Sequence, residues 1–315
     1  MNKNKKIVCF GGGTGLPALL SGLKNNPWLS ITAVVNMFDT GGSSGELKDR
    51  FGILPPGDVL KCLLSLSNRE DSARELLLKR INNQKYNGHT GGNILLLGLE
   101  KVFGDYISAI DALGQLLFVK GKVYPVTLKQ SNLCAEYSDK SIFKGETNID
   151  FGIHEGKFVK KLFLEPNVPA SNEAINAIKE ADAICIGPGS FYTSVLPNFL
   201  PEGITEEISL SKAKVIFIAN LLTEGKGMQG MSLEDIVKTV ENYIKRKVDH
   251  VVANEHLPID NDVLDRYKSE NKYPIIPSGS KKEIFVFSDL WDDKNIARHN
   301  STKLSYVVSG LLSNL

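Results

Sequence analysis

The sequence has no long hydrophobic run and almost no imbalance of charge, and both absences exclude classes of protein. Its longest apolar stretch, residues 94–99, is interrupted by Gly98 and falls far short of the ~18 residues of a membrane span. Lys and Arg total 37 against 36 Asp and Glu, so the formal net charge is +1. This balance gives no electrostatic footprint for nucleic acid or an anionic membrane. We expect neither as a partner, whereas a local phosphate site needs only a few donors.

Cysteine is scarce, and its spacing argues against two further classes. The four cysteines, Cys9, Cys62, Cys134 and Cys185, form no C-x-x-C pair and have no adjacent histidine. This pattern is untypical of a disulfide framework or a zinc cluster. The basic start of the chain is followed by too few apolar residues for a signal-peptide core. We therefore expect reduced, mostly buried thiols in a cytoplasmic protein.

Three common catalytic signatures are also missing. The sequence contains no G-x-x-x-x-G-K-[ST] loop, no G-x-S-x-G elbow and no H-E-x-x-H helix. The residues required for P-loop hydrolysis, serine-hydrolase chemistry and zinc proteolysis are therefore absent from the sequence.

The order of the predicted elements indicates an α/β protein. A strand at 6–10, a glycine turn, a helix at 14–24 and a strand at 31–36 form a βαβ unit, which favours a parallel sheet. After residue 171 the same alternation returns. Its elements are a helix at 172–180, strands at 183–186, 214–219 and 250–253, a helix at 232–245, and a strand and a helix within 284–315.

The middle of the chain has a different pattern. Helical spacing predicts a helix after residues 55–58, with Asp58 as its cap, and further helices at 72–83, 92–103 and 105–118. Short alternating segments follow at 123–127, 133–137, 141–145 and 158–164. We expect one α/β domain over residues 1–315. It is Rossmann-like, with a mostly parallel sheet, helices on both faces and a small antiparallel β insertion at 121–165.

Glycine-rich loops are the most informative part of the sequence. The loop at residues 11–15 joins a strand to a helix, so phosphate oxygens can approach the main-chain N–H groups at the helix start. Residues 13–18 also fit the looser G-x-G-x-x-A pattern of dinucleotide sites. The next strand ends at Asn36 rather than at an acid, which weakens a nicotinamide dinucleotide and leaves another nucleotide open.

Three further loops have a similar character. Residues 39–45 offer several N–H groups and two hydroxyls to one anion, and Asp39 is placed to bind a metal ion or a ribose hydroxyl. Asp58 is either a helix cap or a second carboxylate that faces Asp39 across a cleft. The loop at 88–93 precedes a helix, and the loop at 187–194 follows a strand and opens a helix, as the first one does.

Several polar side chains join these loops as candidates. His89 is placed to donate to a phosphate or to move a proton, and Asn93 either binds ligand or caps a helix. Asn220 and Asn254 end predicted strands, where they could read a base or a sugar. Ligands of open parallel sheets bind outside the carboxyl ends of the strands where the strand order reverses, so we expect the loops to converge there.

The candidates fall into two groups. The expected ligand-binding residues are Gly11, Gly12, Gly13, Thr14, Gly15, Asp39, Gly41, Gly42, Ser43, Ser44, Asn93, Gly187, Gly189, Ser190, Tyr192, Thr193, Asn220 and Asn254. If the protein is an enzyme, the expected catalytic residues are Asp39, Asp58 and His89, with both aspartates as metal ligands.

The ordered glycine loops, together with Pro55-Pro56-Gly57-Asp58 and Gly88-His89, resemble the YvcK/CofD-like family. The YvcK branch, the gluconeogenesis factors, is the closer match, and the resemblance runs from about residue 5 to 255. It implies a cytoplasmic, Rossmann-like protein that binds a nucleotide or a nucleotide sugar, with UDP-sugars associated with this branch. The branch is linked to carbon metabolism, cell shape and envelope synthesis. The CofD branch instead implies a metal-dependent transfer of a 2-phospholactyl group from a nucleotide diphosphate to the deazaflavin Fo.

The sequence departs from the usual family pattern at two positions. Thr40 stands where a second acid is common, and Leu60 stands where an arginine is common. Lys61 follows Leu60, but one helical step turns it by about 100°.

Two functions follow from these residues. The first is a regulator that holds the pyrophosphate of a nucleotide or UDP-sugar on the 11–15 and 187–190 loops, with no obligatory cofactor and Mg²⁺ as a companion of the ligand. The second is a CofD-type transferase. A third hypothesis is a scaffold protein whose glycine loops serve only to pack helices against strands. The sequence does not decide whether the protein forms a homo-oligomer.

Overall fold

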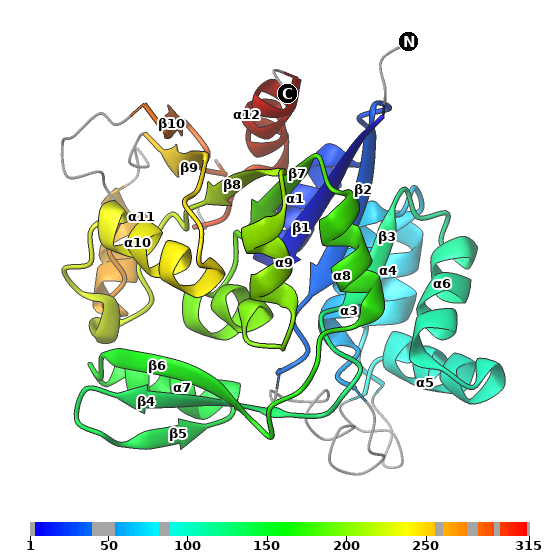
Figure 1. Ribbon diagram of the computed structural model, residues 1–315, viewed down its shortest axis with the longest axis horizontal. Helices are drawn as coiled ribbons and strands as arrows, with labels where there is room; N and C mark the ends of the chain where they lie inside the picture. The colour runs from blue at the N-terminus through cyan, green and yellow to red at the C-terminus, as the bar shows by residue number, and fades with distance from the viewer. Residues whose placement is uncertain are drawn as a thin grey trace.

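The structure is a computed structural model that describes residues 4–39, 54–81, 89–255, 261–275, 283–292 and 297–313. Within these ranges the main body is a parallel seven-stranded sheet in the order β10-β9-β8-β7-β1-β2-β3 (Figure 1). The predicted α/β class with a mostly parallel sheet is confirmed.

The strands of this sheet are short and apolar because both of its faces are covered. β1 (Lys5–Gly11) is buried over its last five residues and pairs with β2 (Leu29–Val35) and β7 (Ala183–Ile186). The remaining strands are β3 (Lys122–Pro125), β8 (Lys214–Ile218), β9 (His250–Asn254) and β10 (Phe285–Ser288).

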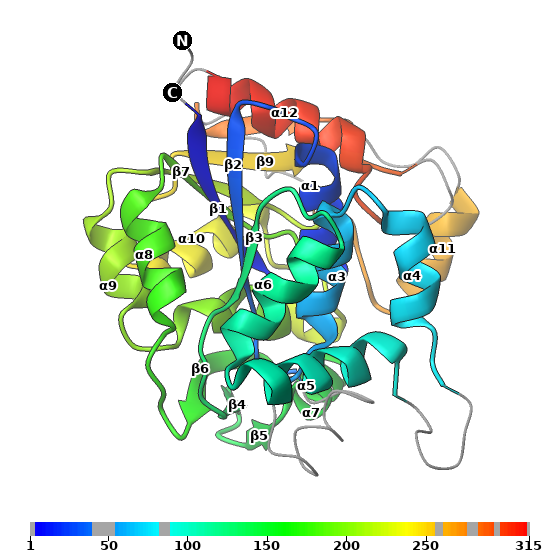
Figure 2. The same cartoon turned by 90° about the vertical axis from the view of Figure 1, so that its right-hand side faces the viewer.

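Helices cover both faces of the sheet, as predicted (Figure 2). One layer contains α1 (Gly15–Leu23) and α3 (Gly57–Leu66), and the other contains α8 (Asn172–Glu180), α9 (Ile204–Leu210) and α10 (Leu233–Ile244). The other helices of the main body are α4 (Glu70–Leu78), α5 (Gly91–Phe103), α6 (Tyr106–Leu116), α11 (Asn261–Ser269) and α12 (Ser301–Ser313). α12 packs directly on α1, where a Cβ added to Gly22 would overlap the carbonyl oxygen of Ser301.

A separate antiparallel sheet lies beyond the carboxyl ends of the main strands (Figures 1 and 2). It consists of β4 (Asn132–Tyr137), β5 (Ile142–Lys144) and β6 (Val159–Glu165). The helix α7 (Glu146–His154), which the sequence did not predict, joins β5 to β6. Its buried residues Ile149 and Ile153 have helical spacing, but the run is too short to stand out.

The predicted insertion at 121–165 therefore needs a correction. The segment expected as its first strand is β3, which pairs in parallel with β2 at the edge of the main sheet. The alternating pattern of a strand does not distinguish a parallel edge position from an antiparallel one.

Two local features depart from expectation near the glycine loops. The expected cap role of Asn93 is wrong, because Thr90 Oγ1 caps α5 by accepting the Asn93 N–H at 3.2 Å. The segment after the 187–190 loop is a π-helical turn, η1 (Phe191–Val195), followed by a 3₁₀ turn, η2 (Leu196–Phe199). Another 3₁₀ turn, η3 (Lys226–Met228), follows β8.

All four cysteines are free and buried, which agrees with the expectation from their spacing. Among the described helices, none combines the length and the apolarity needed to cross a membrane.

Candidate functional site

The two strand-to-helix glycine loops meet at the point where the sheet order reverses. β1 lies between β2 and β7, and the loops that follow β1 and β7 are in main-chain contact. A Cβ added to Gly15 would overlap the carbonyl oxygen of Pro188 and lie 2.6 Å from the nitrogen of Gly189. The structure thus brings these loops together at the carboxyl edge, where open α/β sheets bind ligands.

A cavity of about 780 Å³ opens beside the paired loops. Its walls come from both loops, from α1 and α3, from the start of α7 and from the segments after β8 and before α12. Lining residues that carry charge or hydrogen-bonding groups include Thr14, Lys61, Arg74, Glu146, Ser190, Asn220, Glu224, Lys272, Arg298 and His299.

Asp58 anchors the first loop. Its Oδ2 accepts the N–H of Gly13 at 2.5 Å, and its Oδ1 pairs with Lys61 Nζ at 2.8 Å. Gly13 has φ +63°, a conformation that favours glycine. The expected role of Asp58 as a helix cap is wrong: α3 starts after Pro56 without a side-chain cap, and the carboxylate points to the loop instead.

The start of α1 still offers donors to a ligand. The first N–H groups of a helix have no intrahelical acceptor, and Thr14 and Gly15 at this start line the cavity. The positive end of the helix dipole favours an anion at the same place.

Glu224 anchors the second loop, and sequence reasoning missed it. Its Oε1 accepts the N–H of Phe191 at 2.7 Å and the Nδ2 of Asn220 at 3.1 Å, while Ser190 Oγ donates to its Oε2 at 3.3 Å. Burial raises the pKa of Glu224 to about 7 against the opposing effect of these hydrogen bonds. The site therefore contains a carboxyl that changes its charge near neutral pH.

Asn220 also holds the second loop, through hydrogen bonds from both atoms of its side-chain amide. Its Nδ2 donates to the carbonyl oxygen of Gly189 at 2.7 Å, and its Oδ1 accepts the Gly189 N–H at 3.2 Å. The amide group thus shapes the loop and has a partner at each end.

The insertion helix α7 supplies a second group that the sequence did not reveal. Burial and a hydrogen bond with Asp39 raise the pKa of Glu146 to about 9, which favours the neutral form of Glu146 at neutral pH. Burial also raises the pKa of Asp150 on the same helix, opposed by a hydrogen bond with Thr193.

The described residues do not fit a preformed Mg²⁺ site at Asp39 and Asp58. Both oxygens of Asp58 have partners, and Asp39 is bonded to the protonated Glu146. Elsewhere in the described ranges, no group of three or more acidic, histidine or cysteine side chains is arranged to hold a metal ion.

The cavity walls carry several cations, although Leu60 stands where an arginine is common in the family. Leu60 is fully buried in the core, and the same helical rotation turns its neighbour Lys61 into the cavity. Arg74, Lys272 and Arg298 add positive charge to the walls. Burial lowers the pKa of His299 to about 4, so this imidazole is neutral and its Nε2 lies 3.1 Å from the carbonyl oxygen of Ala219.

Several predicted residues lie away from this cavity. His89 and Asn93 are buried near the start of α5, and Asn254 Oδ1 accepts the N–H of Leu290. Tyr192 directs its hydroxyl to Met231, and Thr193 Oγ1 donates to Ser190 Oγ at 2.8 Å. None of these five predicted side chains lines the described cavity. Gly41, Gly42, Ser43 and Ser44 lie outside the described residues.

Of the site residues that the sequence analysis missed, only some could have been found from a pattern in the sequence. Glu224 follows Asn220 by four positions at the end of β8, so the strand-end rule that selected Asn220 could have selected it. Glu146 lies in an unpredicted helix, and Arg298 lies in a stretch without a motif.

Comparison with known proteins relates the whole chain to one group. The family described as 2-phospho-L-lactate transferase CofD matches residues 7–286. A gluconeogenesis factor of Bacillus subtilis is 36% identical over 320 residues and covers 99% of each chain. Another, from Halalkalibacterium halodurans, is 37% identical and covers 97% of this chain and 96% of the relative. A crystal structure of a UPF0052 family member from Bacillus halodurans superposes with a TM-score of 0.89 at 36% identity, covering 98% of this chain and 99% of that one.

Proposed function

Because the chain belongs to the CofD family, and its near full-length relatives are called gluconeogenesis factors, we propose that it is a regulator that binds a nucleotide or nucleotide sugar. The resemblance found in the sequence motifs is thereby confirmed at the level of the family. The observation that carries the proposal is the main-chain contact between the two glycine loops beside a cavity of about 780 Å³. This volume is within the range of small-molecule sites.

The charge of the cavity supports an anionic ligand. Lys61, Arg74, Lys272 and Arg298 line it against Glu146, Glu224 and Asp292, and the raised pKa values of Glu146 and Glu224 reduce the negative charge of these two carboxyls. A diphosphate would accept hydrogen bonds from the main chain at the start of α1 and from the nearby cations. Mg²⁺ would enter with the diphosphate, since Asp39 and Asp58 already have partners.

Regulation rather than transfer is supported by what the acidic side chains do. Asp58 and Glu224 hold the two loops in shape, and Asp39 is hydrogen-bonded to Glu146. Each carboxyl of this set thus has a structural partner. A UDP-sugar is the ligand that we propose first, and its binding would report on carbon metabolism or envelope synthesis.

Calorimetric titration tests the proposal directly. We expect saturable heat with UDP-N-acetylglucosamine in the presence of Mg²⁺, and GDP and GTP are titrated in parallel to identify the base. If none of the three binds to the folded protein, the proposal is wrong. If the protein makes product from Fo and a phospholactyl nucleotide, and Asp39→Asn loses this activity, the chain is a transferase instead.

Arg298→Ala is expected to weaken the binding of this ligand by at least about tenfold, because a hydrogen bond to a charged group contributes ~1.5–3 kcal/mol. Lys179→Ala is the matched control, since Lys179 lies on α8 away from the cavity and its side chain is 54% exposed. The same titration measures both variants. Equal affinities for Arg298→Ala and Lys179→Ala would place the ligand elsewhere.

A further inference from the structure

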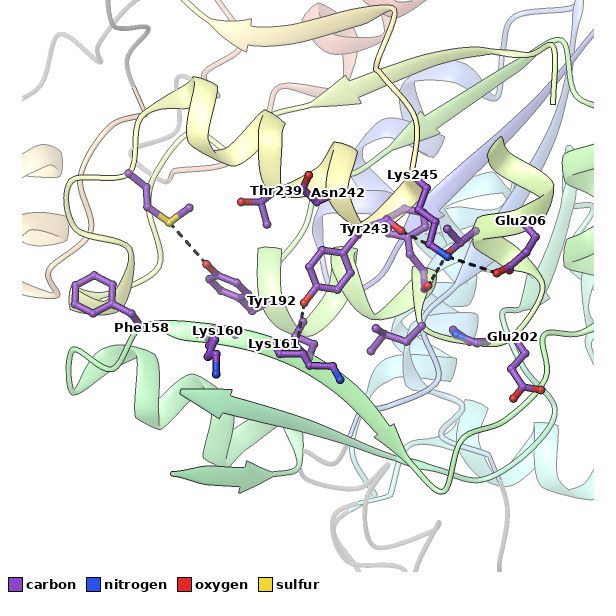
Figure 3. A pocket seen from close by; sticks show the side chains of 18 residues that line it. Phe158, Lys160, Lys161, Tyr192, Glu202, Glu206, Thr239, Asn242, Tyr243 and Lys245 are labelled. Carbon is purple, nitrogen blue, oxygen red and sulfur yellow. Dashed lines mark hydrogen bonds and ion pairs between the residues drawn. The ribbon is translucent and has the colours of Figure 1, made fainter. Parts of the chain in front are cut away.

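A second cavity, of about 720 Å³, lies between the antiparallel sheet and the main body (Figure 3). β6 forms one wall, and α10 with the turns η1 and η2 forms the other. The described linings of the two cavities share no residue. The volume again is in the range of small-molecule sites.

The walls of this cavity carry aromatic rings that are held in place. Tyr243 Oη accepts the N–H of Leu162 at 3.0 Å, so the ring of α10 is tied to β6. Tyr192 Oη donates to Met231 Sδ at 3.7 Å, and Phe158 lies near the end of the cavity (Figure 3). Burial raises the pKa of both tyrosines, so their hydroxyls stay neutral. Fixed rings of this kind suit a flat apolar group.

Lysines from both walls line the cavity. Lys161 comes from β6 and Lys245 from the end of α10, whereas Lys160 Nζ points away from the rings and pairs with Glu136 Oε1 at 2.8 Å (Figure 3). Of the carboxylates nearby, Glu202 accepts from Asn167 at 2.6 Å, and Glu206 accepts the N–H of Gly203 with Oε2 at 3.2 Å and faces Lys245 with Oε1. Lys245 Nζ lies 3.7 Å from Glu206, a long ion pair on a side chain that is 68% exposed.

The backbone conformation of Lys245 is a second, independent indication that this cavity is a functional site. Lys245 ends α10 with φ +53° and ψ +33°, a left-handed conformation in which glycine is the usual residue. A residue with a Cβ costs roughly 1–2 kcal/mol there. Strained positions that keep a side chain cluster at functional sites, and this side chain lines the cavity.

We propose that this cavity is a second small-molecule site, which takes an organic anion with an aromatic body. Its ring packs against Tyr192 and Tyr243, and its acidic group is held by Lys161 and Lys245 from opposite walls. The site is separate from the nucleotide site, although Tyr192 belongs to the turn that follows the second glycine loop.

The test uses the full chain and the dye 1-anilinonaphthalene-8-sulfonate, an aromatic anion whose fluorescence rises on binding. We expect saturable binding that Lys161→Ala and Lys245→Gly each weaken by about three- to fivefold, the effect of one solvent-facing ion pair. Glycine suits the backbone at position 245, so Lys245→Gly is expected to melt no lower than the wild type.

Lys140→Gly is the matched control for this experiment. Lys140 also has a positive φ, +68°, but lies in the turn between β4 and β5, outside the cavity lining. The variant removes the same charge and relieves the same kind of strain, so its affinity for the dye is expected to be unchanged.

The proposal of a second site is wrong if the dye shows no saturable binding, or if Lys161→Ala and Lys245→Gly bind it as tightly as the wild type. It is also wrong if Lys140→Gly loses as much affinity for the dye as these two variants do. Competition by UDP-N-acetylglucosamine would also contradict it, because the dye would then occupy the nucleotide site. Failure of the calorimetric titration with the nucleotide sugar leaves this test unaffected, so the two proposals fail separately.

Discussion

Gly15→Ala is expected to abolish nucleotide-sugar binding and to lower the free energy of unfolding by about 3 kcal/mol, the upper range for overpacking. A Cβ at position 15 would overlap the carbonyl oxygen of Pro188 and lie 2.6 Å from the nitrogen of Gly189. Both atoms belong to the main chain, so the loops must separate to accommodate the methyl group. The donors at the start of α1 then no longer face the second loop. Urea unfolding and calorimetric titration measure the two effects.

Gly98→Ala is the control for the same substitution in a helix. Gly98 lies inside α5, and a Cβ there would meet no atom within 4 Å apart from the neighbouring backbone of its own helix. The change is expected to raise the free energy of unfolding by roughly 0.5–1 kcal/mol, because glycine disfavours the helix interior. If Gly15→Ala were as stable as Gly98→Ala and bound ligand normally, the contact between the loops would not be what builds the site.

Glu224→Gln is expected to change the pH dependence of stability. The pKa of Glu224 is about 7 in the folded protein and near the ordinary glutamate value of 4.5 in the unfolded chain. Between these values the folded state keeps a proton that the unfolded state has lost. The stability contribution is therefore fully present below about pH 4.5 and is lost as the pH rises through 7.

The size of the effect follows from the same two values. A difference of one pKa unit is worth about 1.4 kcal/mol, so the wild type loses about 3 kcal/mol from this group between acid and mildly alkaline pH. Glutamine keeps an oxygen for the N–H of Phe191 and places an amide beside Ser190 Oγ. Glu224→Gln should therefore match the wild type near pH 4.5 and exceed its stability by about 3 kcal/mol at pH 8.

Urea unfolding at several pH values between 4.5 and 8 measures this difference. Glu155→Gln is the control, since Glu155 is exposed at the end of α7 and is expected to follow the wild type throughout. Parallel curves for Glu224→Gln and the wild type would show that folding does not raise the pKa of Glu224. The nucleotide-sugar titration is repeated at pH 6 and pH 8. The affinity for the nucleotide sugar is expected to fall with rising pH in the wild type but not in Glu224→Gln.

Local sequence patterns predicted most of the core of the fold. The run of apolar residues in β1, the glycines at 11–15 and the apolar face of α1 are adjacent in the chain, so they specify a strand, a turn and a helix without distant information. The strand β3 and the helix α7 lacked such local patterns. A four-residue edge strand and a nine-residue helix carry too little periodicity to reveal their partners.

The sequence by itself determined the α/β class, the family and the two glycine loops that form one edge of the site, because each depends on neighbouring residues in a recognisable order. The tertiary structure alone decided the roles of the side chains around them. Asp58 is 45 positions from Gly13, and Glu224 reaches back 33 positions to Phe191. Which of these distant groups meet is fixed by the order of the strands and the placement of the insertion, since hydrogen bonding and burial act between neighbours in space.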